Sequence, residues 1–189
     1  LYALSAHSAT PLALAVVPQG AHAALLDDAG ALVTVLQHGA AHRNRAASGE
    51  KKSEFPMAQP VPDALVTLNA GWAELERLDP RRLLRVLVPP WNRISSPGLV
   101  DELARAGYAG LSRFGPRAPL APPGVAAAPL RQVNTHVDLI DWKGSRGFAG
   151  ADVVLAQAVR HLQARRLGRA DPDEATGWLS HHLVHDPQT

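Results

Sequence analysis

The amino-acid sequence predicts an α/β fold with parallel strands. Short apolar and β-branched runs at 12–17, 31–36 and 84–88 are typical of buried strands. Two longer stretches, 62–78 and 151–166, carry apolar residues at helical spacing instead. Strands that alternate with helices favour a parallel sheet, because each parallel connection needs a crossover that a helix usually supplies.

The predicted elements follow one another along the whole chain. In order they are strand 12–17, helix 21–28, strand 31–36, irregular segment 40–52, helix 62–78, strand 84–88, helix 97–106, strand 110–114, loop 115–129, strand 130–135, loop 144–150, helix 151–166 and strand 177–180. Pro18 and Pro89 end strands because proline lacks the N–H group of a strand ladder. Gly30 and Gly107 stand where helices are expected to end.

The two long helices are each expected to bury one apolar face. The first face consists of Leu65, Leu68, Trp72, Leu75 and Leu78. The second consists of Val154, Leu155, Ala158, Val159 and Leu162. With 189 residues, of which 46% are hydrophobic, we expect a single domain with a sizeable core over residues 1–189.

Composition excludes several classes of function. The chain has no cysteine, which excludes disulfides, thiolate metal ligands and a cysteine nucleophile. No apolar run approaches the roughly 18 residues of a membrane span, and 2–18 lacks the basic start of a signal peptide. The formal net charge is only +2 and the arginines are scattered, so we expect no nucleic-acid partner. A cytoplasmic location is expected, and the oligomeric state stays open.

Two histidines directly follow the second predicted strand. His38 and His42 are four residues apart, and one helical turn at this spacing would place both imidazoles on one side, about 6 Å apart. Two such nitrogen donors suit one zinc-like ion. The alternative is a pair of surface histidines in a loop. The position at a strand end favours the metal site, because active sites of α/β barrels form at that rim.

Three further groups of polar and aromatic residues follow strands. After Pro89 and Pro90, Trp91 carries the first free N–H, which is suited to an oxyanion; a rigid strand exit with a packing Trp is the alternative. The other two groups are Asp138 with Asp141 and Trp142, and His181 with His182, His185 and Asp186. The acids could orient a base, pair with Arg93 or only cap a loop. A histidine at a strand end can serve as a general acid.

These motifs, in this order, resemble those of the polysaccharide deacetylase (NodB-homology, carbohydrate esterase family 4-like) superfamily, in a compact bacterial branch. The resemblance covers essentially the whole chain. It implies a distorted (β/α) barrel of the NodB type, and a metal-dependent hydrolase that removes acetyl groups from a carbohydrate by cleaving an amide C–N bond or an ester. One divalent metal per chain, zinc by expectation, would be held by His38 and His42.

The resemblance also implies roles for other residues. His181 would be the general acid, Asp141 would keep it or the base correctly charged, and the Trp91 amide would hold the oxyanion. Arg93 would supply a nearby charge. The substrate pocket would be lined by Pro90, Asp138, Trp142 and Leu179.

The chain departs from the family pattern in two ways. The Asp-Asp pair that supplies the base and the third metal ligand is absent, and Val88 stands where the family has an arginine. We expect the domain to be truncated at both ends and the chain by itself to be a poor enzyme or none. The alternatives are a non-catalytic carbohydrate-binding or regulatory relative on the same fold, and a different metal hydrolase that uses the cluster at 181–186.

Overall fold

The computed structural model describes residues 9–24, 31–117, 130–181 and 184. The chain divides into two compact units. Unit 1 comprises residues 1–112 and 128–131, and unit 2 comprises 113–127 and 132–189. Each unit is described by itself below.

Unit 1 is built on a sheet whose strands run in the order β1-β2-β3-β4-β5. The strands are β1 (Leu12–Val16), β2 (Val33–His38), β3 (Leu83–Val88), β4 (Gly110–Leu111) and β5 (Arg131–Gln132), of which only the last residue, Gln132, is assigned to unit 2. The pairs β1–β2, β2–β3 and β3–β4 are parallel. The predicted α/β class with parallel strands is therefore confirmed.

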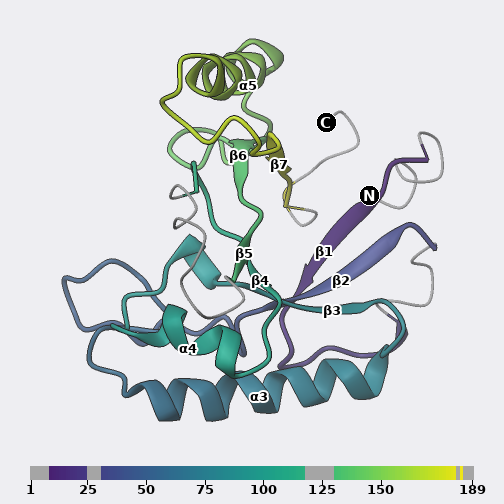
Figure 1. Ribbon diagram of the computed structural model, residues 1–189, viewed down its shortest axis with the longest axis vertical. Helices are drawn as coiled ribbons and strands as arrows, with labels where there is room; N and C mark the ends of the chain where they lie inside the picture. The colour runs from purple at the N-terminus through teal and green to yellow at the C-terminus, as the bar shows by residue number, and fades with distance from the viewer. Residues whose placement is uncertain (1–8, 25–30, 118–129, 182–183, 185–189) are drawn as a thin grey trace. The chain divides into compact units, whose positions relative to one another are not determined.

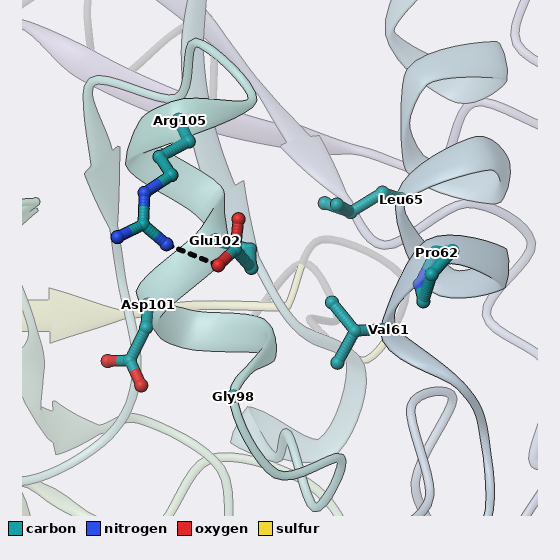
Figure 2. Close-up of a pocket in the computed structure, with 7 residues that line it drawn as sticks. All are labelled: Val61, Pro62, Leu65, Gly98, Asp101, Glu102 and Arg105. Atoms are coloured by element: carbon teal, nitrogen blue, oxygen red, sulfur yellow. Dashed lines mark hydrogen bonds and ion pairs between the residues drawn. The ribbon is translucent and has the colours of Figure 1, made fainter.

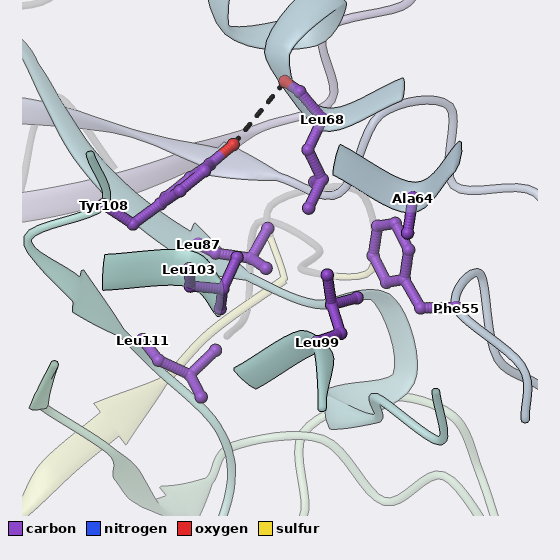
Figure 3. Close-up of a cluster of buried hydrophobic side chains, with 8 residues drawn as sticks. All are labelled: Phe55, Ala64, Leu68, Leu87, Leu99, Leu103, Tyr108 and Leu111. Atoms are coloured by element: carbon purple, nitrogen blue, oxygen red, sulfur yellow. Dashed lines mark hydrogen bonds between the residues drawn. The ribbon is translucent and has the colours of Figure 1, made fainter. Parts of the chain in front are cut away.

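Helices α3 (Val61–Leu78) and α4 (Leu99–Arg105) pack on this sheet (Figure 1). Helix α3 begins with proline in its first turn, where the missing N–H costs nothing. Its buried residues, Ala64, Leu68, Gly71 and Leu75, recur at helical spacing. Side chains from α3, α4, the sheet and the loops meet in the core that Figure 3 shows: Phe55, Ala64, Leu68, Leu87, Leu99, Leu103, Tyr108 and Leu111.

Unit 2 contains a small parallel sheet of β6 (Thr135–Asp138) and β7 (Gly177–Leu179), and helix α5 (Ala151–Arg166). Val137 of β6 packs on Val154 and Ala158 of α5. The bounds of α5 equal the predicted ones, but its buried face does not. Val154, Ala158 and His161 are buried, whereas Leu155, Val159 and Leu162 are about half exposed.

Two other sequence predictions need correction. The strand predicted at 130–135 is two strands, because the side chain of Asn134 bonds to Arg113 N–H and Gly115 C=O between them. Strand β2 extends to His38, so this histidine is the last residue of the strand and does not follow it. The predicted helix at 21–28 lies largely outside the described residues. Among the described residues, no helix has the length and apolar character that crossing a membrane requires.

Candidate functional site

The loops that follow β2 and β3 start side by side. His38 pairs with Val88 at the ends of these parallel strands, and Gly39 N–H donates to the Val88 carbonyl over 3.1 Å. The predicted His38–His42 and Pro89–Trp91 motifs therefore leave the sheet at the same edge. This is the edge at which parallel α/β proteins usually bind ligands.

His38, His42 and Trp91 form a chain of ring contacts at this edge. The ring centroids of His38 and His42 are 5.0 Å apart, and those of His42 and Trp91 are 4.6 Å apart. His38 is half-buried, whereas His42 is exposed. The structure thus brings together both predicted metal ligands and the predicted oxyanion residue, and one of the two imidazoles is open to solvent.

The backbone of both loops is strained where these side chains lie. His42, Trp91 and Asn92 have φ angles of 51°, 53° and 55°, a left-handed conformation that residues other than glycine rarely adopt. Each such residue costs on the order of 1–3 kcal/mol, so the surrounding contacts must hold it in place. Strain of this kind often accompanies a functional site, and here it is found on both sides of the candidate metal-binding rings.

Glu54 holds the His38–His42 loop in place through hydrogen bonds to its backbone. Its carboxylate is fully buried and accepts hydrogen bonds from the N–H groups of Ala40 (3.0 Å), Ala41 (2.8 Å) and, more weakly, Arg43 (3.4 Å). The arrangement fixes the backbone between the two histidines. Glu54 was not predicted from the sequence, because an acid in a polar segment gives no signal of its buried role.

A buried polar network fixes the end of β2. Gln37 donates to the carbonyls of Gly39 and Leu68, each over 2.9 Å, and accepts from the Tyr108 hydroxyl over 2.7 Å. Burial raises the pKa of Tyr108 to about 12, so its hydroxyl remains a donor. The bond to Leu68, which is drawn in Figure 3, connects the end of β2 to α3. Because Gln37 also bonds to Gly39, the two bonds fix the backbone on both sides of His38.

The remaining predicted residues of unit 1 have structural contacts. Arg93 donates from its guanidinium to the Lys52 carbonyl over 2.6 Å. Pro90 is buried and lies close to Gly39. A Cβ atom at residue 39 would lie only 2.7 Å from the Pro90 ring. Both contacts connect the loop after β3 to the segment that precedes α3.

In unit 2, His181 lies beside Asp138 and Trp142. The Nδ1 atom of His181 is 4.0 Å from an Asp138 carboxylate oxygen, and the Trp142 ring meets the His181 ring edge-on at 4.7 Å. Leu179, also predicted for the pocket, is half-buried in β7 and accepts a backbone bond from Leu139. His182, His185 and Asp186 lie outside the described residues.

Asp141 is engaged in its own loop. Its carboxylate accepts the N–H groups of Lys143, Gly144 and Ser145 at 3.0–3.2 Å. These bonds, the one from Gly144 foremost, hold the pKa of Asp141 below its usual value. The carboxylate that lies 4.0 Å from Nδ1 of His181 is that of Asp138.

A buried triad that the sequence analysis missed lies elsewhere in unit 2. Nε2 of His136 is 3.3 Å from one carboxylate oxygen of Glu174, and Nε2 of His161 is 3.6 Å from the other. The two imidazoles are stacked at 3.5 Å, and the donor atoms of all three residues lie within 4.8 Å of one another. The triad could hold a metal ion. Its members come from three separate segments of the chain, so no local sequence motif predicts the triad.

The triad makes the stability of the protein dependent on pH. Burial, and then the charge of the neighbouring His161, lower the pKa of His136 below its ordinary value of 6.5, against a smaller opposite effect of Glu174. The unfolded chain therefore takes up this proton at a higher pH than the folded chain does. The stabilisation is present above pH 6.5 and is lost as the pH falls below it, by up to about 1.4 kcal/mol per pH unit.

Urea unfolding between pH 7.5 and 5.0 measures this effect. The wild-type protein should lose stability with acidification, and His136→Gln should show a shallower dependence. His22→Gln, which changes an exposed histidine, serves as the control and should keep the wild-type slope. Equal slopes for all three proteins would contradict this account of the triad.

A groove in unit 1 lies between α3 and α4 (Figure 2). An ion pair of Arg105 with Glu102 lies on one wall, and Val61 and Leu65 form the other. The groove contains none of the candidate site residues that were predicted from the sequence. Its polar lining consists of Asp101, Glu102 and Arg105.

The chain matches no protein-family model, and no curated protein or solved structure is significantly similar to it.

Proposed function

We propose that this protein is a metal-dependent hydrolase that removes acetyl groups from a carbohydrate, with zinc bound by His38 and His42. In this proposal the strands of unit 1 belong to a distorted (β/α) barrel of the polysaccharide deacetylase type. The motif order described above supports the reaction class. The geometry around His38 supports the metal site.

The hydrogen bond between His38 and Val88 is the observation that carries the proposal. Nδ1 of His38 is 2.8 Å from the Val88 carbonyl oxygen. A carbonyl oxygen can only accept, so Nδ1 carries the proton and the lone pair of the neutral ring is on Nε2. Metal-binding histidines commonly donate their other ring N–H to a backbone carbonyl in this way.

The buried triad has the opposite arrangement at His136. The Gly177 N–H donates to Nδ1 of His136 over 3.2 Å, so this nitrogen must hold the lone pair. In the neutral ring the proton is then on Nε2, directed at Glu174. A proton in that position competes with a metal ion, which favours His38 and His42 over the triad as the zinc ligands.

The residues of this chain would divide the chemistry among them. When bound, a zinc ion would polarise the acetyl carbonyl and activate a water molecule. The Trp91 N–H would donate to the oxyanion, because it follows two prolines in a fixed turn. By the resemblance, His181, as imidazolium, would be the acid that protonates a leaving nitrogen, and Trp142 and Leu179 would be residues of the acetyl pocket; all three belong to unit 2.

Acetate release from N-acetylated chitooligosaccharides tests this proposal. We expect slow, zinc-dependent release that EDTA abolishes, and a loss of about 100-fold or more in His38→Gln and in His42→Gln. His22→Gln should keep the full rate. Release that survives EDTA, or that both site variants retain, would rule out this hydrolase mechanism.

A non-catalytic carbohydrate-binding protein is the second candidate. Among the described residues, the one set of three potential ligands is the buried triad, so none of them joins His38 and His42 as a third acidic or imidazole donor. Saturable binding of the same oligosaccharides without acetate release, with or without zinc, would favour this candidate.

A further inference from the structure

We propose that Asp138, rather than Asp141, is the positioning residue that keeps His181 protonated and oriented. The catalytic consequence of this inference rests on the proposed function, but the contact itself does not. It arises entirely within unit 2, where both acids and the histidine are described.

Asp138 is held in place from two sides. One carboxylate oxygen accepts the Trp142 indole N–H over 2.8 Å, and the other accepts the Ile140 N–H over 3.0 Å. Asp138 is also the last residue of β6, where it pairs with Leu179 of β7. Because His181 follows two residues after Leu179, the parallel pairing brings the imidazole to this carboxylate.

The imidazole of His181 lies next to both Asp138 and Trp142, the residue whose indole bonds to Asp138. Nδ1 of His181 is 4.0 Å from the Asp138 oxygen that also accepts the Ile140 N–H, which is ion-pair range but longer than a hydrogen bond. The Trp142 ring stands at 89° to the imidazole. A single carboxylate thus fixes the indole that packs on His181 and supplies the negative charge beside it.

Asp141 is unsuited to the same task. Three backbone N–H groups of residues 143–145 already bond to its carboxylate. The loop closes so tightly that a Cβ on Gly144 would lie 2.2 Å from an Asp141 oxygen. Asp141 therefore shapes the loop that carries Trp142, and Asp138 acts on His181.

A negative charge beside Nδ1 has two effects on an imidazole. It favours the imidazolium form, and it attracts the proton to Nδ1, so that Nε2 faces away from the acid. A general acid needs both. His181 and Asp138 are 37% and 18% exposed, so solvent screens the attraction and a moderate effect is expected.

Titration of the His181 ring by NMR tests the inference without any activity measurement. The resonance is identified by its loss in His181→Gln. In Asp138→Asn we expect the titration midpoint to move to lower pH by about half a unit or more. Asp138→Glu, which restores the charge, should recover part of the shift.

Asp141→Asn is the matched control. It should leave the His181 midpoint unchanged while it weakens the loop at 142–146, which backbone amide exchange reports. If Asp141→Asn shifts the midpoint and Asp138→Asn does not, the inference is wrong. Backbone spectra of each variant show that unit 2 remains folded.

The pH profile of acetate release separates this inference from the proposed function. If His181 is the general acid, the basic limb of the profile should move to lower pH in Asp138→Asn and stay in place in Asp141→Asn. A shifted NMR midpoint in a protein that never releases acetate would leave the Asp138–His181 pair standing and reject the hydrolase.

Discussion

Replacing Glu54 by alanine is expected to lower the free energy of unfolding by about 3–5 kcal/mol. The carboxylate is the acceptor for three backbone N–H groups, those of Ala40, Ala41 and Arg43. Without it, the amide of the buried Ala40 has no acceptor, and each unsatisfied buried donor costs about 1–3 kcal/mol. Urea unfolding followed by circular dichroism measures the change.

The matched control for this variant is Glu50→Ala. Glu50 is exposed, and its carboxylate accepts one N–H group, that of Ala47, over 3.2 Å. We expect its loss to change stability by about 0.5 kcal/mol. Zinc affinity should fall in Glu54→Ala and stay constant in Glu50→Ala, because only Glu54 fixes the backbone between the two histidines. Similar effects of both variants would show that Glu54 has no special role.

Gly39→Ala is expected to have an effect of similar size, about 3–4 kcal/mol. Gly39 has a φ of +60°, which costs an L-residue about 1–2 kcal/mol. In addition, a Cβ at this position would lie 2.0 Å from a Glu54 oxygen and 2.7 Å from the Pro90 ring. One methyl group would therefore displace the support of the histidine loop and the start of the Trp91 turn together.

Gly49→Ala isolates the backbone cost in this comparison. Gly49 has a φ of +84°, but no atom lies within 4 Å of a Cβ built there. We expect a loss of only about 1–2 kcal/mol, from conformation alone. If thermal and urea unfolding give the two glycine variants the same stability, the close packing of Gly39 against Glu54 and Pro90 is refuted.

Local sequence patterns predicted where helices and strands lie better than they predicted which of their residues are buried. The periodicity at 151–166 predicted α5 to the residue. It could not select the buried face, since Val154, Ala158 and His161 form one stripe at helical spacing and Leu155, Val159 and Leu162 form another beside it. The sheet that α5 packs on decides between the stripes, and that contact is not local.

At the candidate site, too, some residues could be predicted from local sequence patterns and others could not. The spacing of His38, His42 and Trp91 was visible in the sequence, and the parallel pairing of β2 with β3 explains why they meet. The role of Glu54 could not be predicted from the sequence. It depends on how the loop at 39–43 folds back, so that its N–H groups reach the Glu54 carboxylate. The choice between Asp138 and Asp141 also depends on loop closure, which the motif alone does not specify.

The metal content of two variants tests the central claim most directly. The wild-type protein, His38→Gln and His161→Gln would be saturated with zinc, freed of excess metal and analysed for bound zinc per chain. We expect one zinc in the wild-type protein and in His161→Gln, and none in His38→Gln. Zinc that persists in His38→Gln and is lost from His161→Gln would contradict it and assign the metal to the buried triad.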